Sequence, residues 1–337
     1  MWIHVSLKSR KYIVYIIVAI CLGILIFRSS IEGNNQKLIK VLNLHNGDAK
    51  FFGDKIAASV DGYLMILDLE GNVVGYYNGQ GIHTIKANWI APIENEFTLI
   101  YGNFYNEIGV VKFDNNYNLV SNEVVMRTEF LQIDPVIIKK ENIYYMAAIR
   151  IDGVINRSNP SVENGTYSIY WYRSLDLKEW DFISIVAEER YNLEDIDIID
   201  VEGNFGIVYE KELLDKGNSY IVLKVANDKD GADWKKEEKI LLEADCDHEP
   251  AVIQAFKDKY LLYYSCDKDN LGESYMGSKM YVSVYNKEWV LLEKDREIGS
   301  NVEGGIILYD VMERDGKQFF LLSENYFTDG NLVVEER

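Results

Sequence analysis

The chain has 337 residues, of which 48% are hydrophobic and 26% are charged, and its formal net charge is −19 at pH 7. This acidity, with no basic face visible after residue 40, argues against nucleic acid as a partner, because a phosphate backbone needs a positive surface. The 24 Tyr and 13 Phe beside only 4 Pro favour β structure, and a repeated all-β body can use this length as one folded domain.

The first predicted element is a membrane anchor at residues 12–28, which are apolar up to Arg28 and follow a short basic segment, residues 1–11. A helix over the apolar part would span about 24 Å, close to the roughly 30 Å of a bilayer core. No small-x-small cleavage site follows it, so we expect an uncleaved signal anchor rather than a cleaved signal peptide. The basic flank predicts a cytoplasmic start and an extracytoplasmic body.

Residues 29–46 are polar and rich in Asn, Gln and Lys, and we interpret them as a linker. The folded body is then expected at residues 47–337. Its first strands, at about residues 50–80, have turn signals such as Asp61-Gly62 between them but no acidic residue at their start. This stretch therefore looks like an incomplete sheet.

A module that opens with an acid and ends near a tryptophan recurs along the body. Asp195, Glu249 and Glu303 are 54 residues apart, and Asp134-Pro135-Val136 opens the copy before them. The tryptophans that end three copies keep nearly the same spacing and are interpreted as packing residues: Trp180, Trp234 and Trp289. The period suits one four-stranded blade of a β-propeller.

The predicted fold is an all-β, five-bladed β-propeller preceded by a single N-terminal transmembrane helix. The last blade is expected to be completed by the strands at about residues 50–80, which would close the ring and remove exposed sheet edges. The five blades are expected to open near the following residues: Asn88, Asp134, Asp195, Glu249 and Glu303.

Because the first strand of each blade lines the propeller axis, the acids Asp134, Asp195 and Glu249 are predicted to converge there. The spacing to the next strand favours Asp195 over Asp197 as the counterpart of Asp134, and Asp197 stays a second candidate on the same strand face. Crowded carboxylates raise one another's pKa, which supplies the protonated acid and ionised base that glycosidic cleavage needs. The alternative is that such acids only accept backbone hydrogen bonds between blades.

Four further residues are candidates for binding substrate around the axis. Trp89 follows Asn88 at a blade opening and offers a ring for stacking on a sugar, while Glu303 offers hydrogen bonds to hydroxyl groups. His248 is a candidate for holding a water or a metal, but nothing has metal-ligand spacing. We expect no cofactor, although a structural calcium near the axis is left open. Cys246 and Cys266 fit either a disulfide or two buried thiols.

Several of these segments together resemble the five-bladed propeller glycosidases of glycoside hydrolase family 43 and its relatives. The resemblance rests on Asp134-Pro135-Val136-Ile137-Ile138, on the Ser-x-Asp-x-x-x-Trp turn at residues 174–180, and on Glu249-Pro250-Ala251-Val252-Ile253. It implies Asp134 as general base, Asp195 as the residue that modulates pKa, and Glu249 as general acid. Ile196 after Asp195 and His248 before Glu249 depart from the family's usual contexts.

The sequence thus predicts a membrane-anchored glycoside hydrolase, inverting by this resemblance, that acts outside the cytoplasm on a polysaccharide or oligosaccharide containing pentose or furanose units. Its expected partners are a carbohydrate substrate and, through the N-terminal helix, a membrane. Two alternatives remain open: a non-catalytic propeller for glycan binding or cell-envelope assembly, and a signalling ectodomain.

Overall fold

The computed structural model describes residues 37–43, 48–77, 80–81, 84–153, 165–190, 192–213, 217–268, 275–302, 304–324 and 331–337. These residues form strands, and within the described ranges no helix has the length and apolar character needed to cross a bilayer. The predicted basic segment (residues 1–11) and anchor (residues 12–28) lie outside the described residues, so both stay predictions.

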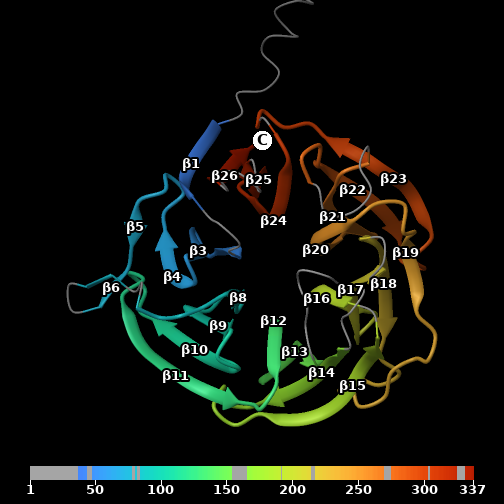
Figure 1. Ribbon diagram of the computed structural model, residues 1–337, viewed down its shortest axis with the longest axis horizontal. Helices are drawn as coiled ribbons and strands as arrows, with labels where there is room; N and C mark the ends of the chain where they lie inside the picture. Colours follow the sequence, from blue (N-terminus) through green and yellow to red (C-terminus); the bar gives the residue numbers. More distant parts are fainter. Residues whose placement is uncertain are drawn as a thin grey trace, which may run out of the picture. The chain divides into compact units, whose positions relative to one another are not determined.

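Six four-stranded antiparallel sheets radiate around a common axis, which makes the fold a β-propeller (Figure 1). We number the blades along the chain. The strands of blades 1 to 3 are, in blade 1, β2 (Ala49–Phe52), β3 (Lys55–Val60), β4 (Tyr63–Leu67) and β5 (Val73–Val74); in blade 2, β8 (Trp89–Pro92), β9 (Thr98–Asn103), β10 (Glu107–Phe113) and β11 (Leu119–Arg127); and in blade 3, β12 (Leu131–Lys140), β13 (Ile143–Asp152), β14 (Thr166–Ser174) and β15 (Asp181–Glu189).

Blades 4 and 5 repeat this order, and blade 6 is closed by a strand from the start of the described chain. The strands are, in blade 4, β16 (Asn192–Val201), β17 (Asn204–Leu213), β18 (Asn218–Val225) and β19 (Lys239–Leu242); in blade 5, β20 (His248–Phe256), β21 (Lys259–Cys266), β22 (Lys279–Asn286) and β23 (Leu291–Ile298); and in blade 6, β24 (Ile306–Arg314), β25 (Lys317–Glu324), β26 (Asn331–Glu336) and β1 (Lys37–Asn43). A two-stranded ribbon, β6 (Tyr76–Tyr77) with β7 (Gln80–Gly81), follows blade 1.

The prediction of five blades is wrong, because the structure has six. Residues 49–74 do not complete the last blade but form a blade of their own, since the short strand β2 adds to β3, β4 and β5. Its opening acid is Asp48, which directly precedes β2. The predicted linker is also wrong in part, because residues 37–43 form β1, the outermost strand of blade 6.

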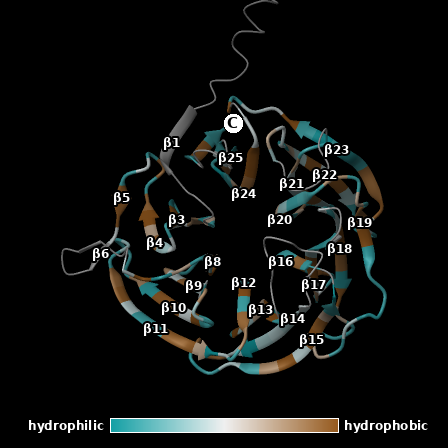
Figure 2. Cartoon of the chain, viewed as in Figure 1, coloured by the Kyte–Doolittle hydropathy of each residue, from teal (hydrophilic) through white to brown (hydrophobic). Residues whose placement is uncertain are grey.

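Aromatic side chains pack within blade 3 and between blades 3 and 4. The indole of Trp171 on β14 stacks on Tyr145 at 5.6 Å and meets the edge of Trp234 at 5.7 Å, while its N–H donates to the carbonyl of Asp230 at 2.9 Å. Gly231 lies against this indole with φ of +71°, and a Cβ there would stand 2.4 Å from Nε1. Hydrophobic segments recur along the strands of each blade (Figure 2).

The tryptophans that end the repeats have the packing role that the sequence predicts. Trp289 is buried and stacks on Tyr260 with ring centroids 4.0 Å apart, and Trp234 is buried in the cluster around Trp171. Trp180 is half-buried against the core between blades 2 and 3.

The seam between blade 6 and blade 1 is fastened by polar bonds beside the axis. Asp310 on β24 accepts a hydrogen bond from the backbone N–H of Phe51 on β2 at 2.8 Å and another from Val311 at 2.8 Å. Lys50 of β2 donates in return to the carbonyl of Tyr309 at 2.8 Å. These bonds join strands at opposite ends of the described chain.

We expect Asp310→Ala to weaken this seam, because it leaves two inward-facing amides without their acceptor. The free energy of unfolding should fall by about 1–3 kcal/mol, measured by chemical denaturation of the purified chain. Asp258→Ala is the matched control, since Asp258 is exposed in the turn between β20 and β21. An equal loss in both variants would contradict a fastening role for Asp310.

Candidate active site

The acids predicted to converge do lie together beside the axis, at the starts of the innermost strands. Asp134 on β12 and Asp195 on β16 occupy the same place in a β-bulge, two residues before the pairs Val136 with Ala147 and Asp197 with Val208. Both have positive φ, 47° and 48°, which bulges use to re-aim a side chain. The backbone N–H of Asp195 lies 3.4 Å from Asp134 Oδ2, and the carboxyl of Asp195 shares a hydrogen bond with that of Glu249.

A second group of axial acids ties neighbouring blades together. Asp48 accepts from the N–H of Ile90 on β8 at 2.7 Å, and Asp197 accepts from the N–H of Ile253 on β20 at 2.9 Å. Asp310 binds Phe51 in the same way. In each case a carboxylate of one innermost strand accepts from the innermost strand of the next blade. Asp197, a candidate for binding substrate, therefore has a structural partner, and burial raises its pKa to about 6.

Glu249 has the environment of a proton donor. Burial raises its pKa well above the ordinary value of a glutamate, and the nearby charges of Asp195 and Asp247 raise it further. The hydroxyl of Tyr275 donates a hydrogen bond to Glu249, which opposes this rise, and it lies 2.7 Å from Asp247 Oδ2. A carboxyl in this setting holds its proton at a pH where a free carboxyl has lost it.

Glu210 on β17 completes this acid cluster, and no motif or spacing in the sequence marks it as a candidate. Its side chain is only 3% exposed, and it accepts no hydrogen bond from any residue of the described ranges. One oxygen from each of Asp195, Glu210 and Glu249 lies within 4.8 Å of the others. Burial raises the pKa of Glu210 well above its usual range, and Asp247 and Glu249 add to that rise.

The same burial acts on Asp134 and Asp195. Burial raises the pKa of Asp134 well above its ordinary value, followed by repulsion from Asp195 and Asp48. Burial also raises the pKa of Asp195, although the hydrogen bond from Glu249 and the charge of Lys50 oppose the rise. Burial lowers the pKa of Lys50, but the charges of Asp48, Asp310 and Asp197 outweigh that effect, so the pKa lies above its ordinary value. The pKa of Asp134, Asp195, Glu210 and Glu249 is thus raised in each case above the ordinary value of a carboxyl group.

Asn88 and Trp89 are used partly for packing. Asn88 Oδ1 accepts from the backbone N–H of Phe104 at 3.3 Å, and the Trp89 ring meets Phe104 edge-on at 4.9 Å. A Cβ added at Gly102 would stand 3.4 Å from both Trp89 and Pro135, so Trp89 lies beside the strand that carries Asp134. Its role as a sugar platform stays a prediction. Glu303 lies outside the described residues.

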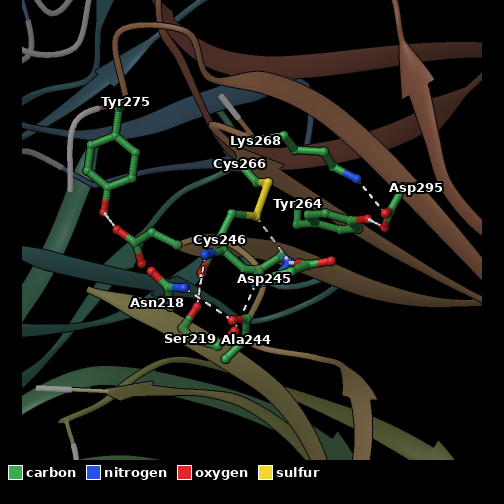
Figure 3. Close-up of a disulfide and its surroundings, with 12 residues drawn as sticks. Asn218, Ser219, Ala244, Asp245, Cys246, Tyr264, Cys266, Lys268, Tyr275 and Asp295 are labelled. Atoms are coloured by element: carbon green, nitrogen blue, oxygen red, sulfur yellow. Dashed lines mark hydrogen bonds and ion pairs between the residues drawn. A yellow bond between two sulfur atoms is a disulfide. The ribbon is translucent and has the colours of Figure 1, made fainter. Parts of the chain in front are cut away.

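Cys246 and Cys266 form a disulfide, which settles the choice that the sequence left open (Figure 3). His248, the residue before Glu249, is 1% exposed. Its backbone N–H donates to Ser219 Oγ, and its ring Nδ1 bonds to the Ser219 carbonyl oxygen. Two donor sets have the composition of a metal site within the described chain. They are Asp195, Glu210 and Glu249, and Cys246, His248 and Cys266. The first offers the oxygen ligands that calcium prefers, so a calcium ion near the axis stays a prediction.

No model of a protein family matches the sequence, and a search of curated proteins finds no match. Solved structures do resemble the fold. A Trypanosoma rangeli sialidase in complex with the inhibitor DANA aligns with a TM-score of 0.55 and 12% identity over 88% of this chain, which covers 55% of the sialidase. An alpha-L-arabinofuranosidase from Lactobacillus brevis gives a TM-score of 0.51 and 12% identity over 71% of this chain and 86% of that one.

A GH32 beta-fructofuranosidase from Bombyx mori, solved as a mutant with sucrose, gives a TM-score of 0.50 and 13% identity. It aligns over 74% of this chain, which spans 60% of the length of that enzyme. At these identities the likeness concerns the fold, and the propellers that share it here are glycosidases.

We expect Glu210→Gln to stabilise the protein at alkaline pH. Because the pKa of Glu210 is raised in the folded state, folding binds a proton, and stability falls as pH rises from the unfolded pKa of about 4.3 through the folded value. Thermal unfolding across pH 4 to 9 should show the variant melting above the wild type at high pH and converging with it near pH 4. Exposed Glu179→Gln is the control, and a pH-independent difference would contradict the assignment.

Proposed function

We propose that this chain is a glycoside hydrolase whose reaction centre is the cluster of Asp134, Asp195 and Glu249. The observation that carries the proposal is the hydrogen-bonded pair of Asp195 and Glu249, in which burial and mutual repulsion raise the pKa of Glu249 well above its usual range. Glycosidic cleavage needs a carboxylic acid that still holds its proton near neutral pH. The fold shared with solved glycosidases supports the same reaction class.

In this mechanism Glu249 protonates the leaving glycosidic oxygen, and Tyr275 keeps the Glu249 carboxyl in place through its hydroxyl. Asp134 acts as general base on the attacking water and must be ionised to do so. The N–H of Asp195 and the charge of Lys50 favour that ionised form, against burial and Asp195 repulsion. Attack by water on the face opposite the leaving group inverts the anomeric centre. The anomer first released, followed by NMR, tests inversion.

We further propose that the substrate is an extracytoplasmic polysaccharide or oligosaccharide with pentose or furanose units, and that residues 12–28 anchor the protein in the cell membrane. The Cys246–Cys266 disulfide supports an oxidising location. Two of the glycosidases with a similar fold are described as an arabinofuranosidase and a fructofuranosidase, which supports furanose sugars.

One observation favours a second candidate, a non-catalytic glycan-binding propeller. Asp48, Asp197 and Asp310 all accept backbone hydrogen bonds from the next blade, so an acidic axis does not require catalysis. The experiments below separate binding from turnover.

Glu249→Gln should lower kcat about 10²–10⁴-fold on substrates with a poor leaving group, because general acid catalysis contributes a factor of that order. Aryl furanosides and pyranosides with alkyl-phenol and dinitrophenol leaving groups form the panel. The loss should be much smaller on dinitrophenyl glycosides, whose leaving group needs no proton. If no substrate turns over in the wild type while binding persists in both proteins, the binding-module alternative stands and the enzyme proposal fails.

Asp195→Asn should move the pH profile of kcat/KM toward lower pH. The charge of Asp195 raises the pKa of both Asp134 and Glu249, so its removal lowers both values. The acidic limb, set by loss of the Asp134 proton, and the basic limb, set by loss of the Glu249 proton, should shift in the same direction. Asp197→Asn, two residues along the same strand, is the control and should cost stability without moving both limbs.

A further inference from the structure

Asp245, Cys246, His248 and Cys266 gather at the open end of the β20–β21 hairpin (Figure 3). His248 pairs directly with Cys266 across the two strands, and both cysteines and the histidine are at most 1% exposed. Asp245 lies at the surface side of this group, with its carboxylate half exposed. The mechanism proposed above uses none of these four side chains.

The ring of His248 has a fixed orientation. Its Nδ1 lies 2.9 Å from the carbonyl oxygen of Ser219, and because a carbonyl only accepts, Nδ1 carries a proton. The other nitrogen, Nε2, faces Asp245 Oδ1 at 3.3 Å and Cys246 Sγ at 3.4 Å. Neither of these atoms brings a proton, so the position between Nε2 and Asp245 Oδ1 is filled either by a proton on Nε2, whose hydrogen bond lowers the pKa of Asp245, or by another cation.

We propose that reduction of the Cys246–Cys266 disulfide converts this group into a tetrahedral zinc site. The ligands are the two thiolates, His248 Nε2 and Asp245 Oδ1. Zinc is bound at about 2.3 Å by thiolate and 2.0–2.1 Å by imidazole, so tetrahedral geometry sets the S···N edge at about 3.6 Å and the N···O edge at about 3.4 Å. The structure has 3.4 Å and 3.3 Å on these two edges.

Two rearrangements complete the tetrahedron. The ligand atoms of Cys246, His248 and Cys266 already lie within 4.8 Å of one another, a set to which Asp245 does not belong. The two sulfurs, bonded in the disulfide, must separate to about 3.8 Å, and the Asp245 carboxylate must turn toward them. The bond from Nδ1 of His248 to the Ser219 carbonyl is the outer contact that metal-bound histidines commonly make, and it holds Nε2 toward the ion. Lys294, 3.1 Å from Asp245 Oδ2, offsets part of the negative charge.

The chemistry balances with a phosphine as reductant. The phosphine takes an oxygen atom from water and becomes a phosphine oxide, its electron pair breaks the S–S bond, and the two protons of the water end on the two sulfurs. Zinc then displaces both thiol protons to solvent, since thiolate is the ligand. Binding to the reduced chain should therefore strengthen as pH rises.

The test uses the full chain in detergent, with Cys21→Ser so that Cys246 and Cys266 are its remaining cysteines. Oxidised protein and protein reduced with a phosphine and then desalted are titrated with Zn²⁺, and with Co²⁺ as a spectroscopic probe. We expect one metal ion per reduced chain, with thiolate-to-cobalt charge-transfer bands and tetrahedral d–d bands. We expect neither in the oxidised chain.

His248→Ala and Asp245→Asn, with both cysteines kept, should each weaken Zn²⁺ binding by roughly 10-fold or more, whereas Asp258→Asn should not. Circular dichroism of each variant reports whether it folds, so weaker binding is attributed to a lost ligand only in a folded variant. Reduced protein that binds no Zn²⁺ would show that the place holds only a proton, shared by His248 and Asp245. Equal binding by the oxidised chain would locate the metal elsewhere, and either result overturns the proposal.

Discussion

The structure depends on a carboxylate at the start of one innermost strand accepting a backbone amide of the next blade. Asp48, Asp197 and Asp310 do this at 2.7 to 2.9 Å. On the side that faces the axis, each innermost strand has no further strand of its own blade to pair with. A carboxylate from the preceding blade therefore accepts a hydrogen bond from a backbone N–H that would have no acceptor within its own blade. Acids are therefore placed near the axis for stability before any chemistry is considered.

This constraint concentrates negative charge beside the axis, where burial raises the pKa of every one of these acids. Backbone hydrogen bonds and the charge of Lys50 oppose that rise at Asp48, Asp197 and Asp310. The pKa of Asp134, Glu210 and Glu249 lies well above the ordinary value, because repulsion from neighbouring carboxylates adds to burial. Carboxylates that bond one blade to the next thus lie beside other carboxyl groups and raise their pKa, and acid–base catalysis requires carboxyl groups of raised pKa.

Much of the fold and the position of the acids could be predicted from the sequence, because the repeats preserve both spacing and polarity. The equal spacing from Asp134 to Tyr144 and from Asp195 to Phe205 made Asp195 the counterpart of Asp134, and the two residues do occupy the same position in their strands. The blade count failed because β2 has only four residues and its acid, Asp48, lies at the edge of a polar stretch that looks like a linker. The rule that an acidic residue opens a repeat would have identified this blade, because Asp48 directly precedes β2.

Contacts between distant segments could not be predicted in this way. Tyr275 reaches Glu249 and Asp247 from the segment between β21 and β22, and Glu210 faces the acid cluster from a second strand. Neither residue stands at a repeated position that the other blades mark. The state of Cys246 and Cys266 was undecidable for a different reason, since the register of the hairpin that brings them together follows from pairing rather than from composition.

The position of β1 as the outermost strand of blade 6 has a consequence for how the protein folds. Because β1 pairs with β26, two adjacent strands of the last sheet come from opposite ends of the described chain, and this contact has nearly the greatest sequence separation that the described residues allow. Contacts of such separation form late, after most of the loop-closure entropy has been lost in earlier steps. During synthesis the first blades can assemble while β1 waits unpaired, and the ring is sealed only when the final strand emerges.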